Sequence, residues 1–298
     1  MKVLVTGANG FLGFHLVESL LRAGLPVVAT SKGACRLPFT GHRLFTYASL
    51  DFTREKDVHL LMEKIRPDIV VHAGALSKPD ACEQNRELAY EVNVMGTSHL
   101  LKAASGTGAH FIFLSTDFVF SGEKGMYREE DPTGPVNYYG ETKCQAENLV
   151  KAYVPGWSIV RTVLVYGPVK DDRKNLPLLI ADKLRNGEPY AVVNDQVRTP
   201  TFVRDLAGAI VTIAKKKAGG IWHISGNDIL TPYQMALKTA EWLGLDTHLL
   251  KEVNASLFPE PARRPLVTGF CTDKAREKLG FIPTPFEEGL RLTFGDQK

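Results

Sequence analysis

The chain has 298 residues, of which 44% are hydrophobic and 23% are charged, and its formal net charge is +3. These are ordinary values for a globular protein, and the length suffices for a large domain with a smaller one beside it. The basic run KKK at 215–217 ends a predicted helix and is too short to follow a phosphate backbone. We therefore expect no nucleic-acid partner.

The cysteines are far apart, with no CxxC pair and no neighbouring histidine; they are Cys35, Cys82, Cys144 and Cys271. This spacing indicates neither a metal site nor a disulfide framework, and free thiols are typical of a reducing compartment. No apolar run reaches the length of a membrane span, and the sequence opens on the strand-like KVLV rather than on a signal peptide. We expect a cytoplasmic protein without a membrane partner.

Strand-like and helix-like patterns alternate over the first 166 residues. Apolar runs predict strands at 2–5, 26–30, 43–47, 68–75, 111–116 and 158–167. Helical spacing predicts helices at 11–22, about 57–65 and about 90–104. Val- and Ile-rich runs without polar alternation are typical of buried parallel strands. Because such strands alternate with helices, the pattern predicts an α/β, Rossmann-type doubly wound parallel sheet.

The pattern changes after Tyr166, where Pro and Gly become denser and the elements become shorter. A helix at 205–217 and a strand at 221–225 are expected to return to the first domain, and two short helical stretches are expected after Pro232. We therefore divide the chain into a Rossmann domain, 1–166 plus about 203–225, and a smaller, partly discontinuous C-terminal α/β domain, about 167–202 plus 226–298.

Glycines follow the first predicted strand in the segment GANGFLG, where Gly7, Gly10 and Gly13 have the spacing GxxGxxG. Glycine permits a tight turn at the first position, close backbone approach to a pyrophosphate at the second, and close helix packing at the third. Free N–H groups at the helix N-terminus favour an anion. The strand–loop–helix context predicts a dinucleotide site, and a tight turn without a ligand is the alternative.

The end of the second predicted strand carries Ser31, Lys32 and Arg36 and no acidic residue. An acidic residue there would favour NAD, because it binds the ribose hydroxyls. Two cations favour the 2′-phosphate of NADP instead. NAD stays open as the cofactor. The alternative for Lys32 and Arg36 is that they are exposed loop charges without a ligand.

Tyr139 and Lys143 have the spacing YxxxK, which puts both side chains on one face of a helix. A tyrosine can give a proton to a developing alkoxide, and a nearby ammonium would lower its pKa for this purpose. Ser115 and Thr116 end the fifth predicted strand, at the sheet edge where ligands bind in such folds. A hydroxyl there can bind a substrate carbonyl, and capping a turn is the alternative role.

The motifs GANGFLG, STDFVFSG, YGETK and RTVLVYGP, in this order, resemble the extended short-chain dehydrogenase/reductase superfamily over nearly the whole chain. Within it, the strongest resemblance is to the dTDP-4-dehydrorhamnose reductase family. STDFVFSG is similar to that family's STDYVFDG, and DQVRTPTFVRDLA to its DQxGxPT segment and DLA helix. RRPLVTGFCTDKAREKLGF is similar to its RPxxSxLDxxKLxxxxG stretch.

The resemblance implies a catalytic set of Thr116, Tyr139 and Lys143, with Tyr139 as proton donor and Lys143 as its activator and ribose ligand. It implies a cofactor site formed by Gly7, Asn9, Gly10, Phe11, Leu12, Gly13, Ser31, Lys32, Arg36, Asp51, Phe52, Ala73, Gly74, Ala75, Tyr139, Lys143 and Val165. It implies substrate contacts from Thr116, Asp117, Phe118 and Arg198, and no metal ligand.

Two residues depart from the reductase pattern: Leu164 replaces a frequent aromatic residue, and Arg198 replaces the DQxG glycine. Other extended members carry an arginine near this place for a nucleotide diphosphate, which a guanidinium suits. The function implied is NADPH-dependent reduction of a nucleotide-linked 4-keto sugar. The substrate would bind the smaller domain, and a homodimer is a candidate assembly.

Two other functions stay open. One is an NAD-dependent nucleotide-sugar epimerase; a dehydratase is disfavoured because Phe118, not an acid, follows Asp117. The other is a non-catalytic NADP-binding regulatory subunit resembling the methionine adenosyltransferase β subunit, whose corresponding segment also carries an arginine before PT.

Overall fold

A computed structural model describes residues 1–258 and 261–296. Within these residues, the central sheet has seven strands, all parallel, in the order β10-β6-β5-β4-β1-β2-β3. Its strands are β1 (Val3–Thr6), β2 (Val27–Ser31), β3 (Phe45–Ser49), β4 (Ile69–His72), β5 (His110–Thr116), β6 (Trp157–Thr162) and β10 (Gly220–Ile224). The strand order reverses at β1, which places the ligand crevice of such a sheet at the carboxyl ends of β1 and β4. The predicted doubly wound parallel sheet is confirmed.

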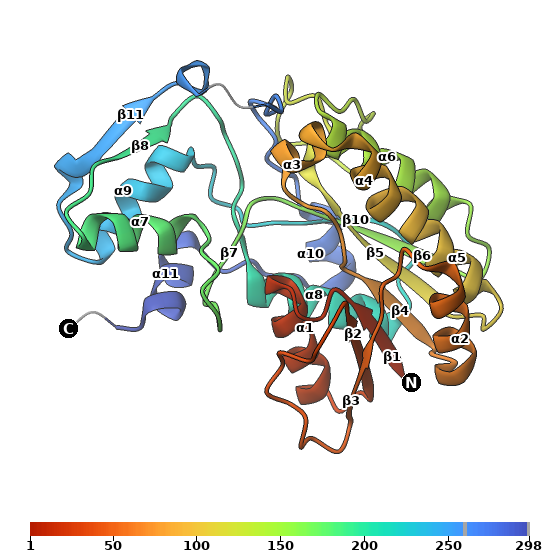
Figure 1. Cartoon of the computed structure of the whole chain (residues 1–298). Helices are drawn as coiled ribbons and strands as arrows, with labels where there is room; N and C mark the ends of the chain where they lie inside the picture. The colour runs from red at the N-terminus through yellow and green to blue at the C-terminus, as the bar shows by residue number, and fades with distance from the viewer. Residues whose placement is uncertain (259–260, 297–298) are drawn as a thin grey trace.

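Helices cover both faces of this sheet (Figure 1). One face packs against α1 (Phe11–Arg22), α8 (Val203–Lys216) and α10 (Asp273–Leu279). The other packs against α2 (Glu55–Ile65), α5 (Gly96–Ser105) and α6 (Tyr138–Lys151). Because α10 shares the core of the large sheet, part of the 226–298 segment that we assigned to the smaller domain belongs structurally to the larger one.

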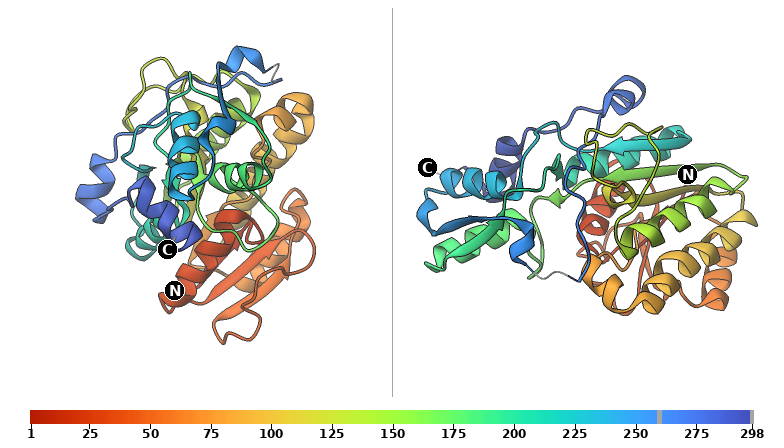
Figure 2. Two further views of the ribbon diagram at one scale, coloured as in Figure 1. Left: turned by 90° about the vertical axis from the view of Figure 1, so that its left-hand side faces the viewer. Right: turned by 90° about the horizontal axis from the view of Figure 1, so that it is seen from above.

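The remaining elements form a second lobe beside the sheet, which Figures 1 and 2 show from three directions. It contains α7 (Leu176–Arg185), β8 (Tyr190–Val193), α9 (Pro232–Trp242), η3 (Thr247–Leu249), β11 (Leu250–Val253), η4 (Ala255–Leu257) and α11 (Phe286–Phe294). Strands β8 and β11 pair in parallel. In the described residues, the α-helices α9, α10 and α11 follow Thr231, where the sequence predicted two. A capping box between Thr231 and Gln234 starts α9.

The chain leaves the sheet earlier than the single predicted strand at 158–167 implied. Strand β6 ends at Thr162, Leu164 adopts a φ of +30°, and β7 (Val165–Tyr166) pairs instead with β9 (Thr201–Phe202). A positive φ at a leucine breaks the extended backbone and redirects the chain. The long apolar run therefore contains a turn that its periodicity does not reveal.

The helix predicted at about 90–104 is also divided. The chain forms α3 (Pro79–Gln84) and α4 (Arg86–Tyr90), then one π-helical turn, η1 (Glu91–Met95), before α5 begins. Such π-helical turns occur frequently at functional sites, and Glu91 and Val92 of this one line a pocket described below.

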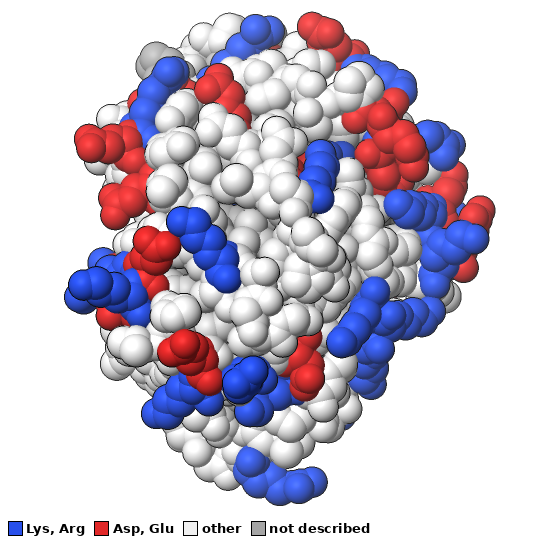
Figure 3. All heavy atoms as spheres, turned by 90° about the vertical axis from the view of Figure 1, so that its right-hand side faces the viewer, with Lys and Arg blue, Asp and Glu red and all other residues white. Residues whose placement is uncertain are grey.

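In the part of the chain that the structure describes, no helix combines the length and the apolarity that a membrane span requires. The same residues include no cluster of His, Cys, Asp and Glu side chains suited to a metal ion. On the face shown in Figure 3, basic and acidic side chains are interspersed.

Candidate active site

The loop between β1 and α1 is built around glycines that no other residue could replace without movement. Gly7 has a φ of +69°, and a Cβ there would lie 2.7 Å from the Gly74 nitrogen. A Cβ at Gly13 would lie 2.3 Å from the Gly7 carbonyl oxygen. Gly10 precedes the first residue of α1, and no side chain caps that helix. The loop therefore brings uncapped backbone N–H groups to an open surface, which suits a phosphate.

A cleft of about 560 Å³ extends from this loop to Tyr139 and Lys143. A pocket of about 400 Å³ adjoins it and shares Gly7 and Gly74 with its lining. Each volume is in the range of small-molecule sites. The residues predicted to bind the cofactor all line one of these two spaces: Gly7, Asn9, Gly10, Phe11, Leu12, Gly13, Ser31, Lys32, Arg36, Asp51, Phe52, Ala73, Gly74, Ala75, Tyr139, Lys143 and Val165.

The adjoining pocket is shaped by Phe52, whose ring is held between two glycines. A Cβ at Gly74 or at Gly96 would lie 2.5 Å from a ring carbon of Phe52. Beside it, Lys32 forms an ion pair of 2.8 Å with Asp51, and this ammonium lowers the pKa of the Asp51 carboxyl. Lys32, which we expected at a 2′-phosphate, therefore already has a carboxylate partner.

Asn9 joins the loop between β1 and α1 to the loop after β2. Its backbone nitrogen donates to Ser31 Oγ at 2.9 Å, and its Nδ2 donates to the Ala34 oxygen at 2.9 Å. Its Oδ1 accepts the backbone N–H of Arg36 at 3.0 Å. These bonds hold the loop after β2, which contacts the adenosine ribose in dinucleotide-binding folds, against the loop after β1, which contacts the pyrophosphate.

At the other end of the cleft, α6 positions Tyr139 and Lys143. Asn137 caps this helix by accepting the Gly140 N–H at 2.9 Å. Lys143 Nζ donates to the Leu114 oxygen at 2.8 Å and lies 3.9 Å from the centre of the Phe113 ring. Burial lowers the pKa of Lys143 to about 7, although the Glu147 carboxylate opposes this shift.

Tyr139 lines the cleft, and Thr116 lies near enough to its hydroxyl to influence its pKa. The Phe118 ring packs edge-on against the Tyr139 ring, with 5.9 Å between their centres. Burial raises the pKa of Tyr139, and the neighbouring Thr116 hydroxyl only partly offsets this effect. Desolvation therefore outweighs the lowering of the Tyr139 pKa that we expected from Lys143.

A buried ion pair distinguishes Ser115 from Thr116. Arg161 donates to Glu147 through Nε at 2.9 Å and through Nη2 at 2.7 Å, and both side chains are 1% exposed. Ser115 Oγ donates to the same carboxylate at 2.6 Å. Ser115 is therefore committed to Glu147, and Thr116 is the hydroxyl that meets Tyr139.

Thr116 is itself oriented by its neighbours at η2 (Asp117–Val119). Its Oγ1 donates to Asp117 Oδ1 at 3.1 Å and accepts the Phe118 N–H at 3.2 Å. The other oxygen of Asp117 accepts the Thr268 hydroxyl and lies 3.9 Å from Arg198 Nε. Burial raises the pKa of Asp117, and the Arg198 charge opposes that rise.

Arg198 is only 4% exposed and holds the C-terminal segment rather than an open surface. Its terminal N–H groups donate to oxygens of Val197, Leu266, Gln196 and Pro265. In this arrangement a diphosphate would have to displace one of these oxygens. Among the predicted substrate residues, the structure thus joins Thr116, Asp117 and Arg198 in one buried network.

Two residues of this region were missed by the sequence analysis. Asn93, in the π-helical turn, accepts the Leu76 N–H at 2.8 Å and donates to Thr142 at 3.0 Å, so it braces the loop after β4 against α6. Arg173, which lies between β7 and α7, donates to the Asn9 oxygen at 2.6 Å and lines the cleft. A buried asparagine inside a predicted helix was the available signal for Asn93, and Arg173 had none.

Comparison with known proteins places this geometry in a family. Residues 1–297 match the family model of the RmlD substrate binding domain. The chain is 31% identical to the spore coat polysaccharide biosynthesis protein SpsK of Bacillus subtilis (strain 168) over 97% of this chain and 95% of that protein. It is 30% identical to the methionine adenosyltransferase 2 subunit beta of Xenopus laevis, over 98% and 86%.

A crystal structure of dTDP-4-dehydrorhamnose reductase from Bacillus anthracis in complex with NADP has the same fold. It superimposes with a TM-score of 0.86 at 29% identity, covering 98% of each chain. The chain thus belongs to the RmlD substrate-binding-domain family, within the extended short-chain dehydrogenase/reductase superfamily of NAD(P)-dependent oxidoreductases.

Proposed function

We propose that this protein uses NADPH to reduce the keto group of a nucleotide-linked 4-keto sugar. The observation that carries the proposal is that Tyr139 and Lys143 line the same cleft as the glycine loop, with Thr116 beside the Tyr139 hydroxyl. A proton donor at one end of a dinucleotide cleft suits carbonyl reduction. The family, and the reductase from Bacillus anthracis solved with NADP, support the substrate class.

In the proposed reaction, Thr116 and Tyr139 bind the oxygen of the sugar carbonyl. The dinucleotide, when bound, supplies the hydride that the carbonyl carbon accepts. Tyr139 then gives its phenolic proton to the oxygen and regains one from solvent. Its raised pKa keeps Tyr139 protonated at neutral pH, which is the state that a donor requires. Lys143, one helical turn away, favours the tyrosinate that forms.

The residues present fit NADP. The glycine loop takes its tight turn only with glycine, because a Cβ at Gly7, Gly10 or Gly13 would collide with backbone, and no side chain caps the N–H groups of α1 that would bind a pyrophosphate. After β2, Ser31 and Arg36 line the cleft. Asp51 is paired with Lys32, so its charge is offset rather than free to repel a phosphate.

A non-catalytic, cofactor-binding regulatory subunit is the second candidate. Two observations favour it: the 30% identity to the methionine adenosyltransferase 2 subunit beta, and the enclosure of Arg198 by protein oxygens. The Thr116, Tyr139 and Lys143 set favours turnover, and the two candidates differ in whether any keto sugar is consumed.

The test is to incubate the protein with NADPH and dTDP-, UDP- or GDP-linked 4-keto sugars, and to follow NADPH fluorescence and the sugar products together. The proposal predicts equimolar loss of NADPH and keto sugar, slowed by about 10²-fold or more in Tyr139→Phe. Conversion of the sugar without net NADPH loss would overturn it in favour of an epimerase. Tight NADPH binding with no sugar consumed would overturn it in favour of the regulatory subunit.

A further inference from the structure

Arg173 lies in the loop between β7 and α7, far in sequence from the residues whose surface it covers. Its Nη2 donates to the Asn9 backbone oxygen at 2.6 Å, across 164 residues of sequence. Arg173 also borders a cavity of about 100 Å³ together with Gly10 and Arg36. The same loop is held to α1 by His15, whose Nε2 lies 2.8 Å from the Pro168 oxygen. The loop therefore closes one side of the phosphate loop.

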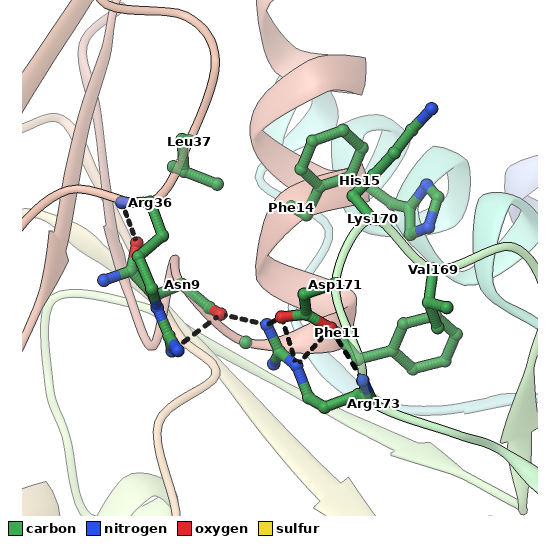
Figure 4. A pocket seen from close by; sticks show the side chains of 11 residues that line it. Asn9, Phe11, Phe14, His15, Arg36, Leu37, Val169, Lys170, Asp171 and Arg173 are labelled. Carbon is green, nitrogen blue, oxygen red and sulfur yellow. Dashed lines mark hydrogen bonds and ion pairs between the residues drawn. The ribbon is translucent and has the colours of Figure 1, made fainter.

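A second guanidinium reaches the same oxygen from the other side. Arg36 Nη2 donates to the Asn9 oxygen at 3.4 Å, and Figure 4 shows that oxygen between the two arginines. A carbonyl oxygen carries only a partial charge, so it offsets little of the repulsion between two guanidinium groups. The carboxylate that faces them is Asp171, which accepts Arg173 Nε at 2.9 and 2.7 Å.

The charged groups around this cavity leave an excess of positive charge. Arg36, Lys170 and Arg173 line it with a single acid, Asp171. His15 also lines it, and burial lowers the pKa of His15, so it adds no charge at neutral pH. Three cations against one anion leave a net charge of about +2 beside the uncapped N-terminus of α1, which favours a dianionic ligand.

We propose that Arg36 and Arg173 form a two-sided clamp for a phosphate of the bound dinucleotide, a role that rests on the cofactor site proposed above. The planar guanidinium fork matches phosphate oxygens and stays charged at all relevant pH values. The 2′-phosphate of NADP is the phosphate that the contacts favour. Asn9 is bonded to Ser31 at the end of β2 and to Ala34 and the Arg36 backbone in the following loop, which is where this fold binds the adenosine ribose.

Asp171 competes with this phosphate for Arg173. While the carboxylate holds the guanidinium, part of the charge that would bind the phosphate is already offset. Asp171 thereby sets how tightly the clamp closes, and it lies 39% exposed, so its replacement leaves the core unchanged.

The test measures binding, so its outcome does not depend on whether any sugar is reduced. Dissociation constants for NADPH and NADH are determined by titration calorimetry for the full chain and for Arg173→Gln, Arg36→Gln and Asp171→Asn. Lys174→Gln is the matched control, because Lys174 is a neighbouring cation whose own partner is Asp182. Thermal unfolding of each variant confirms that it is folded.

Arg173→Gln should weaken NADPH binding by about tenfold or more, as expected for a charge-assisted hydrogen bond, while Lys174→Gln leaves it unchanged. Asp171→Asn should tighten NADPH binding. If Arg173→Gln loses affinity for NADPH alone, the clamp binds the 2′-phosphate. If it loses equal affinity for NADH, the clamp binds the pyrophosphate. If Arg173→Gln binds both cofactors as the wild type does, the clamp does not exist.

Discussion

The two ends of the cleft are built in different ways. At the glycine loop, much of the geometry follows from the seven residues of GANGFLG, because a Cβ at Gly13 would meet the Gly7 oxygen, and only Gly7 is also limited by a distant segment, at Gly74. At the other end, Thr116 is oriented by Asp117, which in turn meets Thr268 and Arg198 from distant parts of the chain. The geometry of the glycine loop is therefore determined mainly by one short segment, whereas the substrate end depends on how the C-terminal segment docks.

The strongest test of the substrate end is Tyr139→Phe, which removes the proton donor and keeps the ring. We expect kcat/KM for the keto sugar to fall by about 10²- to 10⁴-fold, the usual contribution of general acid catalysis. NADPH affinity should hold, because the phosphate contacts lie at the other end. Steady-state kinetics with calorimetric binding checks both, and retained turnover would exclude Tyr139 as the acid.

Glu147→Gln tests the buried ion pair that holds Ser115, the residue before Thr116. It leaves Arg161 buried without a countercharge, and breaking such a pair costs about 3–5 kcal/mol of unfolding free energy. Urea denaturation measures this loss. The comparison is Lys102→Ala, which removes an exposed pair with Glu55 and should cost at most about 1 kcal/mol. Equal effects of the two changes would show that the buried pair carries no special weight.

Gly13→Ala tests the local encoding of the cofactor end. The added Cβ would meet the Gly7 oxygen, and such overpacking costs about 1–3 kcal/mol, with weaker NADPH binding as a consequence. Gly208→Ala is the matched control in α8, where a Cβ meets nothing within 4 Å. Because alanine is the better helix former, that change should stabilise the protein by up to about 1 kcal/mol. The account predicts that the unfolding temperature falls in Gly13→Ala and rises in Gly208→Ala. Changes of the same sign in both variants would contradict it.

Asp117→Asn tests the long-range network. It removes the charge beside Arg198 and weakens the acceptor for Thr116, so kcat should fall by about tenfold, as expected for one charge-assisted hydrogen bond. NADPH binding should not change, since Asp117 lies outside the cofactor cleft lining. A parallel loss of cofactor affinity would show that the two ends are not independent.

The smallest effect concerns the pH dependence of cofactor binding. Burial lowers the pKa of Lys143 to about 7, so the free protein loses this positive charge as the pH rises through 7. If the bound cofactor favours the ammonium, affinity declines above pH 7 by at most about tenfold per pH unit. NADH is the suitable probe, because it lacks the titrating 2′-phosphate. A flat profile, or the same slope in Lys143→Met, would contradict the assignment.

Sequence reasoning reached most of the large sheet and the cofactor end, because both follow from short-range patterns. The Val- and Ile-rich runs predicted buried parallel strands, and the glycine spacing predicted the phosphate loop. Local sequence patterns did not predict the turn at Leu164, the π-helical turn around Asn93 or the contact of Arg173 with Asn9. Each depends on packing between segments far apart in the chain, for which local periodicity gives no signal.

The burial of Arg198 also depends on packing between segments far apart in the chain, so the sequence did not predict it. From the sequence, an arginine before PT suggested a free diphosphate ligand, whereas the structure surrounds its guanidinium with oxygens of Pro265 and Leu266. Only the docked C-terminal segment supplies those carbonyls. The substrate end is thus the region where the comparison of sequence with structure changed the interpretation most.

The measurement that tests the central claim most directly is hydride transfer from NADPH deuterated at both C4 positions of its dihydronicotinamide. After incubation with dTDP-4-dehydrorhamnose, mass spectrometry of the sugar product shows whether deuterium has moved. The account predicts one deuterium in each product molecule with the wild type, and product formation with Tyr139→Phe that is slower by about 10²-fold or more. An undeuterated, isomerised sugar, or no conversion of any keto sugar at all, would contradict it.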